Sequence, residues 1–457
     1  MPLQKNQVLT LRVERLSSDG SGVAHSPDGE TVFIPGVAPG DEARVRIVKD
    51  CKRYAFGILD EVLTPSPDRI PVDCAVAGPC GGCSLRHLDY AAELRAKQEN
   101  VADAFARIGG LDVPVLPIVG SPEVNRYRNK VQFPVGVDKS GKPCIGFYAG
   151  RTHRIVPCPD CRLQPGVLNE IGNALCAFFA EKGIQPYSEE TGRGLVRHIF
   201  LRRGAHSGQI MVCLVCTRAR LPSAEELCTR LKAQFAEITT ILLNVNAKNT
   251  NVILGTETHT LYGPGYIEDT LCGVPVQLGP LSFYQVNTLA AEQLYGIAAQ
   301  YAQLTPDDLL LDLYCGMGTI GLSMAAHCRE LIGVEIVPEA IESAKANAAR
   351  MGADVAAKSR FFCADAGQAA TRLAAEGLHP DIVMLDPPRK GCDEATLSAV
   401  VRMSPRRVVY VSCNPATAAR DAAWLEQNGY HAEKVQPVDL FPRTRHVEAI
   451  VSLQREI

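Results

Sequence analysis

Residues 309–325 read LLLDLYCGMGTIGLSMA, and this stretch decides the fold of the C-terminal part of the chain. The apolar run up to Leu313 predicts a buried strand, and the segment after Gly318 predicts a helix. Gly316 and Gly318 predict a tight turn between them, because glycine lets a ligand approach the backbone and leaves the amides of a helix N-terminus free. A glycine turn also occurs for steric reasons alone. The loop by itself therefore neither establishes nor excludes a nucleotide-type ligand.

Three later apolar runs end in acidic residues. LIGVE ends at Glu335, 23 residues after Asp312, where an acidic side chain accepts the ribose hydroxyls of a nucleoside in other α/β units. Asp365 and Asp386 follow the next two runs. Because these strands alternate with Ala-rich helices, we expect a Rossmann-like, mostly parallel sheet with helices on both faces.

The run VVYVSCNP places Cys413 after another strand of this sheet, and Glu448 starts the last strand, in VEAIVSL. A cysteine at a strand end is usually a small buried residue, and a glutamate there is usually solvated. A thiolate at the ligand edge can also be a nucleophile, and a nearby carboxylate can be a base. Gly321 completes the spacing Gly-x-Gly-x-x-Gly, so the glycine pattern alone does not exclude a dehydrogenase.

Five phrases carry a resemblance to a known family: SFYQVN, DLYCGMGTIGL, LDPPRKG, VSCNPAT and FPRTRHVEAIVSL. Together they strongly resemble the RNA uridine-5-methyltransferases, which are class I enzymes dependent on S-adenosyl-L-methionine. The resemblance implies a nucleophile at Cys413 and a base at Glu448. The implied cofactor contacts are Gln285, Tyr314, Glu335 and Asp386, and the predicted cofactor site also includes Asp365, Gly316 and Gly318.

Residues 8 to 62 read as short alternating strands between Gly, Pro and Asp turns, which predicts a small OB-like β-barrel. The barrel resembles the TRAM domain, which implies contact with RNA. Its later strands carry a basic cluster, namely Arg44, Arg46, Lys49, Lys52 and Arg53. We therefore expect three domains: a TRAM-like barrel at 1–63, an α+β domain at 64–275 and a methyltransferase domain at 276–457.

A cysteine cluster follows the barrel. Cys74, Cys80 and Cys83 are close in sequence, and Cys158 or Cys161 completes a set of four. Two Cys-x-x-Cys pairs fit zinc and leave Cys74 spare, whereas the first three cysteines with one late cysteine fit a cubic iron-sulfur cluster. The family resemblance implies a 4Fe-4S cluster held by Cys74, Cys80, Cys83 and Cys161, with Cys158 as a departure.

Composition and charge limit the classes of function that the chain can have. The chain has 457 residues, 46% hydrophobic, with a net charge of -3, so nucleic-acid binding requires a local basic patch. Residues 126–162 supply eight Lys or Arg against two Asp, although a solvated sheet face explains this equally well: Arg126, Arg128, Lys130, Lys139, Lys142, Arg151, Arg154 and Arg162. No leader or membrane-span pattern is present, so we expect a cytoplasmic protein without a membrane or an obligatory protein partner.

These observations predict a 23S rRNA (uracil-5-)-methyltransferase that forms a covalent Cys413-uracil adduct. Ribosomal RNA is expected because barrel and cysteine cluster both resemble rRNA-modifying members, whereas tRNA-modifying members generally lack both. A tRNA uridine-5-methyltransferase and a non-catalytic RNA-binding iron-sulfur protein are the alternatives. A radical iron-sulfur enzyme would need three cysteines spaced by three and two residues, which the chain lacks.

Overall fold

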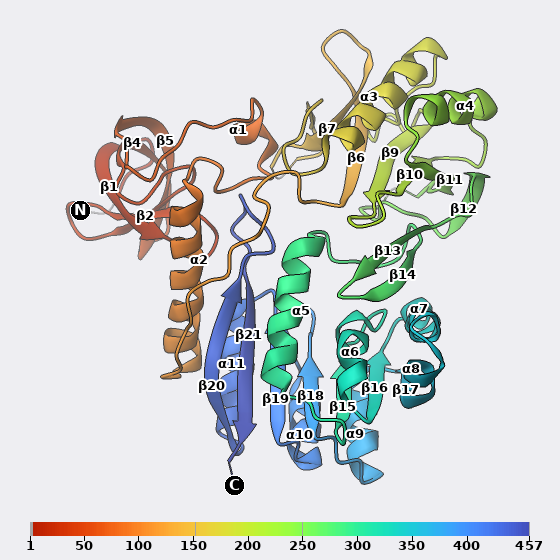
Figure 1. Ribbon diagram of the computed structural model, residues 1–457. Coiled ribbons are helices and arrows are strands. Elements are labelled where there is room, and N and C mark those ends of the chain that lie inside the picture. The colour runs from red at the N-terminus through yellow and green to blue at the C-terminus, as the bar shows by residue number, and fades with distance from the viewer. Residues whose placement is uncertain (1–2, 151, 249, 457) are drawn as a thin grey trace.

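The computed structural model describes residues 3–150, 152–248 and 250–456, so Arg151 of the basic segment lies outside the described residues. The chain begins with a closed barrel in the strand order β1-β2-β3-β5-β4 (Figure 1). Alternate side chains of β1 and β4 point into a small apolar core, as the two-residue period requires. The barrel strands are β1 Val8–Leu16, β2 Gly22–His25, β3 Thr31–Ile34, β4 Glu42–Asp50 and β5 Tyr54–Thr64.

A loop and a long helix connect the barrel to the rest of the molecule. The short α1 (Ala77–Cys80) lies in the cysteine segment, and α2 (Tyr90–Ala104) continues into a π-helical turn, η1 (Phe105–Gly109). Asp89 begins α2 by accepting a hydrogen bond from a backbone N–H of the first turn. The C-terminal end of α2 packs into the core of the C-terminal sheet.

The central unit is a seven-stranded sheet in the order β12-β11-β10-β9-β6-β7-β8. Helices α3 and α4 share a hydrophobic core with this sheet. A hairpin, β13-β14, follows the sheet in sequence. The elements are β6 Lys130–Val137, β7 Pro143–Tyr148, β8 Ile155–Pro157, α3 Gly166–Glu181, β9 Val196–Arg203, β10 Ile210–Cys216, α4 Ala224–Gln234, β11 Ile238–Val245, β12 Glu257–Tyr262, β13 Ile267–Leu271 and β14 Val274–Leu278.

The C-terminal sheet has the order β17-β16-β15-β18-β19-β21-β20. Its first five strands are parallel, and β21 runs antiparallel to both neighbours. The strands are β15 Leu309–Leu313, β16 Glu330–Glu335, β17 Ser359–Cys363, β18 Ile382–Leu385, β19 Arg407–Ser412, β20 Tyr430–Val438 and β21 Glu448–Arg455. The helices are α5 Thr288–Ala302, α6 Thr319–Met324, η2 Ala325–His327, α7 Pro338–Arg350, α8 Ala353–Lys358, α9 Ala366–Ala375, α10 Glu394–Met403 and α11 Pro415–Glu426.

Two hydrophobic cores cover the two faces of this sheet. One contains side chains of α9, α10, α11 and α2. The other contains α5 and α6, the β13-β14 hairpin and side chains of the central sheet. The expected architecture of barrel, α+β unit and doubly covered α/β sheet is therefore confirmed. Among the described residues no helix is long and apolar enough to cross a membrane.

Candidate active site

The parallel strands of the C-terminal sheet bring the predicted site residues to one edge. β15, β16, β18 and β19 are neighbours in one sheet, so their carboxyl ends lie side by side (Figure 1). Tyr314, Glu335, Asp386 and Cys413 each follow or end one of these strands. Open α/β sheets bind ligands at this edge.

The glycine loop between β15 and α6 is a tight left-handed turn. Tyr314, Gly316 and Gly318 have φ values of 67°, 55° and 78°. An added Cβ at Gly318 would lie 3.1 Å from Leu322 and 3.2 Å from Ala344, whereas a Cβ at Gly316 would meet no atom within 4 Å. Packing therefore requires glycine at position 318, while Gly316 leaves open space beside the backbone.

Glu335 is oriented by backbone amides. Its Oε2 accepts a hydrogen bond from Gly316 N at 3.2 Å, and its Oε1 accepts from Ile336 N at 2.9 Å and Val337 N at 3.0 Å. A carboxylate offers about four acceptor positions, so capacity for another donor remains. The side chains of Ile336 and Val337 are exposed, which places apolar surface beside this carboxylate.

Asp365 has a structural contact of its own. It begins α9, and its side chain accepts a hydrogen bond from Gln368 N at 3.1 Å. It is next to Ala364, whose N–H donates to the backbone oxygen of Glu335. Asp365 therefore lies beside Glu335 and also caps a helix.

Gln285 comes from the segment between the two sheets. Its side chain hydrogen-bonds the buried Tyr295, whose hydroxyl lies 3.3 Å from Thr319 Oγ1 at the start of α6. Its backbone oxygen accepts from Asn129 Nδ2 at 2.8 Å. Asn129 belongs to the central unit, so that unit helps to hold Gln285 at the glycine loop.

Sequence reasoning missed Asp312 as a site residue. It is buried under the glycine loop, and its Oδ2 accepts from Gly321 N at 3.0 Å. Its Oδ1 has no hydrogen-bond partner among the described residues. Burial, with nearby Asp386 and Glu335, raises the pKa of Asp312 to about 8. The sequence signal was present, because Asp312 is the one charged residue inside an apolar strand.

Cys413 and Glu448 meet at the reactive part of the edge. Ser412 pairs with Ala449 across the antiparallel β19 and β21, so the residues one step beyond this pair, Cys413 and Glu448, face each other. Cys413 is half-buried, whereas Glu448 is buried. The structure therefore brings the predicted nucleophile and base together.

Two neighbouring charged groups, Asp386 and Arg389, shift the pKa values of this pair. Burial raises the pKa of Glu448 to about 8, with a further contribution from Asp386. Burial also raises the pKa of Asp386 to about 7 and, together with the charge of Glu448, raises the pKa of the Cys413 thiol. The Arg389 guanidinium lowers the pKa of both Cys413 and Glu448. Arg389 is a second residue that sequence reasoning missed, although it lies in the phrase LDPPRKG.

The segment that leads into Glu448 is held by a buried ionic network. Lys97 Nζ on α2 lies 2.7 Å from Glu93 Oε1 and 2.8 Å from Asp439 Oδ1, and all three side chains are at most 1% exposed. Arg443 N donates to Glu93 at 2.7 Å. The backbone oxygen of Arg443 accepts from Leu85 N at 3.1 Å, which ties the cysteine segment to the same loop.

The structure also brings the predicted cluster cysteines together. All are free thiols, and Cys80 and Cys83 interact electrostatically with Cys74 and Cys161. The Cys158 thiol donates a hydrogen bond to Cys161, which lowers the pKa of Cys161. No group of three or more described His, Cys, Asp or Glu side chains is close enough to hold a single metal ion.

Two arginines, the buried Arg86 and the half-buried Arg128, lie beside these thiols with buried N–H groups that have no acceptor among the described residues. Arg86 lies beside Cys83 and pairs with Asp73 at 2.6 Å through Nη1, but its Nε and Nη2 have no partner among the described residues. Arg128, whose Nε also lacks a described partner, lies near Cys161. Unpaired buried donors of this kind fit a negatively charged group among the cysteines.

The fold and the polar edge define a class I methyltransferase. The profile of the tRNA (uracil-5-)-methyltransferase family matches residues 207–456, and that of the TRAM domain matches residues 2–59. The chain therefore belongs to the uracil-5-methyltransferase family. It is an RNA methyltransferase that acts on carbon 5 of uracil and uses S-adenosyl-L-methionine.

Known relatives extend over the whole chain. A protein of Halalkalibacterium halodurans named as an uncharacterized RNA methyltransferase is 42% identical over 454 residues, 99% of this chain and 98% of its own. A similarly named protein of Clostridium tetani is 40% identical over 451 residues, 99% of this chain and 97% of its own.

A solved structure is also similar. Pyrococcus abyssi tRNA (uracil-54, C5)-methyltransferase in complex with S-adenosyl-L-homocysteine is 27% identical, with a TM-score of 0.77 over 98% of this chain and 100% of its own.

Proposed function

We propose that the chain methylates carbon 5 of a uridine in 23S rRNA through a covalent adduct at Cys413. The position of Cys413 opposite Glu448 at the ligand edge is the observation that carries this proposal. The Cys413 thiolate adds to carbon 6 of uracil, which makes carbon 5 nucleophilic. S-adenosyl-L-methionine, when bound, would supply an electrophilic methyl group that bonds to carbon 5 while its bond to the sulfonium sulfur breaks, leaving S-adenosyl-L-homocysteine.

Glu448 completes the reaction. Its carboxylate takes the proton from carbon 5, the electron pair re-forms the double bond between carbons 5 and 6, and the Cys413 thiolate leaves. The elevated pKa of Glu448, about 8, makes its carboxylate a stronger base than a solvated one. Glu448 sits directly across from the sulfur that departs, so one residue pair serves both addition and elimination.

Seven predicted residues form the proposed cofactor site. Glu335 accepts the ribose hydroxyls, and the open space at Gly316 admits the ligand to the backbone. Asp386 and Asp312 add two buried carboxyl groups with raised pKa values to this edge, and a bound sulfonium cation would favour their ionised forms. The predicted set is Gln285, Tyr314, Gly316, Gly318, Glu335, Asp365 and Asp386, to which we add Asp312.

We assign the cysteine group to a 4Fe-4S cluster held by Cys74, Cys80, Cys83 and Cys161. A single zinc ion with bonds of about 2.3 Å draws its four sulfurs to within about 3.8 Å of one another. A cubic cluster binds each cysteine at a separate iron and leaves the sulfurs further apart. The four thiols interact electrostatically, and the unpaired arginine donors beside them suit a negatively charged cluster.

Each proposed domain has its own task. The barrel (1–63) and the central domain (64–275) hold RNA, and residues 276–457 carry the chemistry. The cluster has a structural or RNA-positioning role, because methyl transfer and proton removal consume no external electrons.

Transfer RNA is the second candidate substrate. The Pyrococcus abyssi enzyme is named for tRNA, and its whole chain aligns with 98% of this one. Similarity over the full chain therefore does not distinguish an rRNA substrate from a tRNA substrate. We had expected tRNA-modifying members generally to lack the barrel and the cysteine cluster. Ribosomal RNA stays our proposal because the cysteine set resembles that of rRNA-modifying members.

The substrate is tested with labelled methyl donor and either 23S rRNA or total tRNA, followed by mass mapping of 5-methyluridine. We expect incorporation into 23S rRNA and none with Cys413→Ala. Incorporation into tRNA alone would reject the rRNA assignment and leave the chemistry intact. A folded protein that binds no S-adenosyl-L-methionine would instead favour the non-catalytic RNA-binding alternative.

A further inference from the structure

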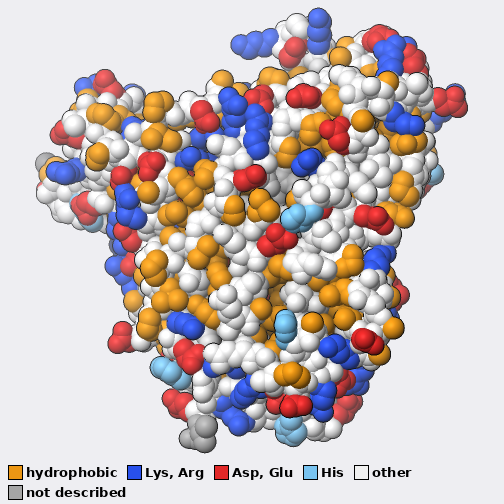
Figure 2. Space-filling view, in the orientation of Figure 1, with side chains coloured by type: hydrophobic (Ala, Val, Ile, Leu, Met, Phe, Trp, Pro, Cys, Tyr) orange, Lys and Arg blue, Asp and Glu red, His pale blue; other side chains and the backbone are white. Residues whose placement is uncertain are grey.

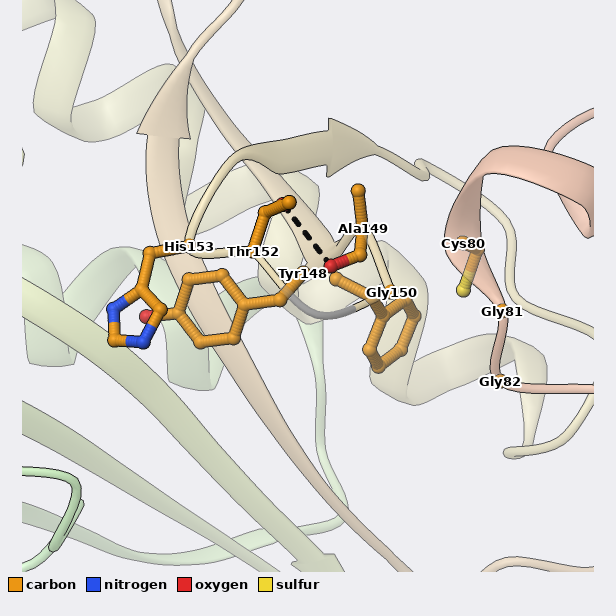
Figure 3. Close-up of a pocket in the computed structure, with 9 residues that line it drawn as sticks. Cys80, Gly81, Gly82, Tyr148, Ala149, Gly150, Thr152 and His153 are labelled. Carbon is orange, nitrogen blue, oxygen red and sulfur yellow. Dashed lines mark hydrogen bonds between the residues drawn. The ribbon is translucent and has the colours of Figure 1, made fainter. Parts of the chain in front are cut away.

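A cavity of about 510 Å³ lies beside the cysteine group, away from the methyl-transfer edge. Residues 80–82 form one wall, and residues 147–150 with 152 and 153 form the other (Figure 3). In Figure 3, Cys80 lies on one side of Ala149 and Gly150, and on the other side the Tyr148 ring extends away from Cys80 toward His153. A nucleotide-sized group fits this volume.

The aromatic wall is held in place before any ligand arrives. The rings of Tyr148 and His153 lie with centroids 5.4 Å apart at an interplanar angle of 33°. The Tyr148 hydroxyl is 3.5 Å from Nε2 of the buried His198, and His153 pairs with Glu189. Because these rings are already oriented, a planar group binds them at a low entropic cost.

The mouth of the cavity is open. A Cβ added at Gly150 would meet no atom within 4 Å, and the backbone of Gly150 lies 3.8 Å from a Cβ built on Gly81. A free metabolite would keep much of its surface in water in such a site, whereas a nucleotide that belongs to a longer strand gains contacts elsewhere. An open aromatic site therefore favours a polymer over a small molecule.

The charge around the cavity favours an anionic polymer. The segment 126–162, in which the aromatic wall lies, carries eight Lys or Arg against two Asp in sequence, although Arg151 lies outside the described residues and Arg126 pairs with Asp160. Arg154, one residue beyond His153, is exposed and forms no ion pair with a described residue. Figure 2 shows Lys and Arg side chains on the surface around α1. Figure 1 places α1 and β7 beyond the carboxyl ends of β18 and β19, the edge at which Cys413 lies.

We propose that this cavity binds an unpaired nucleotide of the RNA substrate, distinct from the methylated uridine, with its base against Tyr148 and His153. Base stacking on aromatic side chains is the usual way in which proteins hold unpaired RNA. The inference rests on the RNA methyltransferase function. It gives the cysteine group a role in RNA binding, because Cys80 belongs both to the cavity wall and to the proposed cluster ligands.

The test compares RNA affinity and the KM for RNA in protein that retains its iron. Tyr148→Ala is expected to weaken both about ten-fold or more, since one stacked base is lost. Tyr148→Phe keeps the ring and is expected to bind as the unchanged protein does. Gly150→Leu fills the mouth without removing a ring, and is expected to weaken RNA affinity as well. Tyr262→Ala, at the opposite edge of the same sheet, is the matched control and is expected to change neither quantity.

Each outcome is decisive. Unchanged RNA affinity in Tyr148→Ala and Gly150→Leu would overturn the inference. Equal losses in Tyr148→Ala and Tyr148→Phe would also overturn it, because the hydroxyl contact with His198 and not stacking would then matter. Methylation by the unchanged protein is measured alongside, so a failure of the proposed function is visible separately.

Discussion

The reactivity of Cys413 depends on a balance of three charged neighbours. Burial and the charges of Glu448 and Asp386 raise the pKa of the thiol, whereas Arg389 lowers it. The same guanidinium lowers the pKa of Glu448. The nucleophile and the base both react in their deprotonated forms, so one exposed arginine supports both steps.

This balance predicts the pH dependence of the reaction. Glu448 has a pKa of about 8, and the pKa of Cys413 is raised, so kcat/KM is expected to increase with pH between about 6 and 8.5. Arg389→Ala raises both pKa values further. Its kcat/KM is expected to be roughly three- to ten-fold lower at pH 7 and to recover toward the unchanged protein near pH 9.

Steady-state kinetics at a series of pH values measures this effect. Lys390→Ala, one residue further along and not among the groups that shift these pKa values, is the control and is expected to keep the original profile. An Arg389→Ala profile with the original midpoint would contradict the assigned charge balance.

At the scale of elements, α2 connects the cysteine segment to the loop before Glu448. Its apolar positions Val101 and Ala104 pack into the C-terminal core, as the helical period predicts. Its Glu93 and Lys97 are buried too, in contact with Asp439. The helix is therefore joined to the catalytic unit by charge as well as by apolar contact.

Removing the central cation tests this connection. Lys97→Ala leaves the carboxylates of Glu93 and Asp439 buried without their partner, and is expected to lower the free energy of unfolding by about 3–5 kcal/mol. Denaturant unfolding measures the change. Lys345→Ala breaks an exposed ion pair with Glu342 and is expected to cost less than about 1 kcal/mol. Equal stability of the two variants would show that the network does not hold α2.

This network also shows where sequence reasoning stops. Glu93 and Lys97 are four residues apart on one helix and resemble an exposed pair, since their partner Asp439 is 342 residues away from Lys97 in sequence. The barrel strand β2, GVAH, is only four residues long and is flanked by glycine and serine, so its sequence pattern is weak. Local pattern does not reveal long-range partners or very short strands.

The edge of the C-terminal sheet was more accessible from sequence. Each parallel strand is recognisable in the sequence as an apolar run. Glu335, Asp386 and Cys413 could therefore be placed at one edge of the sheet from the sequence alone. The pairing of Cys413 with Glu448 needed the register of β19 and β21, which no local pattern gives. The family resemblance supplied that pair instead.

At the scale of the whole molecule, the central sheet and the methyltransferase sheet share one hydrophobic core. Phe200 and Leu242 of the central unit pack in the same cluster as Leu294 of α5 and Leu310 of β15. The cavity beside Cys80 and the edge at Cys413 are thus carried by units in direct contact. An RNA that bound at both places would contact two units that share one hydrophobic core.

The cluster assignment is a prediction at this scale, because its ligands join segments 74–83 and 158–161. Protein purified without oxygen is expected to contain iron and sulfide at about four of each. Cys161→Ser is expected to lose most of the iron, while Cys158→Ser keeps it, since Cys158 only donates a hydrogen bond to Cys161. Stoichiometric zinc without iron in the anaerobic protein would reject the cluster.

The trapped intermediate tests the central claim most directly. Glu448→Gln nearly keeps the shape of the side chain but cannot accept the carbon 5 proton, so addition and methyl transfer proceed while elimination stalls. With labelled methyl donor and a 23S rRNA fragment, it is expected to accumulate a methylated protein-RNA conjugate that survives denaturing electrophoresis. Cys413→Ala is expected to form no conjugate and to lose at least about a thousand-fold in methyl transfer. A conjugate in Cys413→Ala, or full turnover by Glu448→Gln, would contradict the assignment of nucleophile and base.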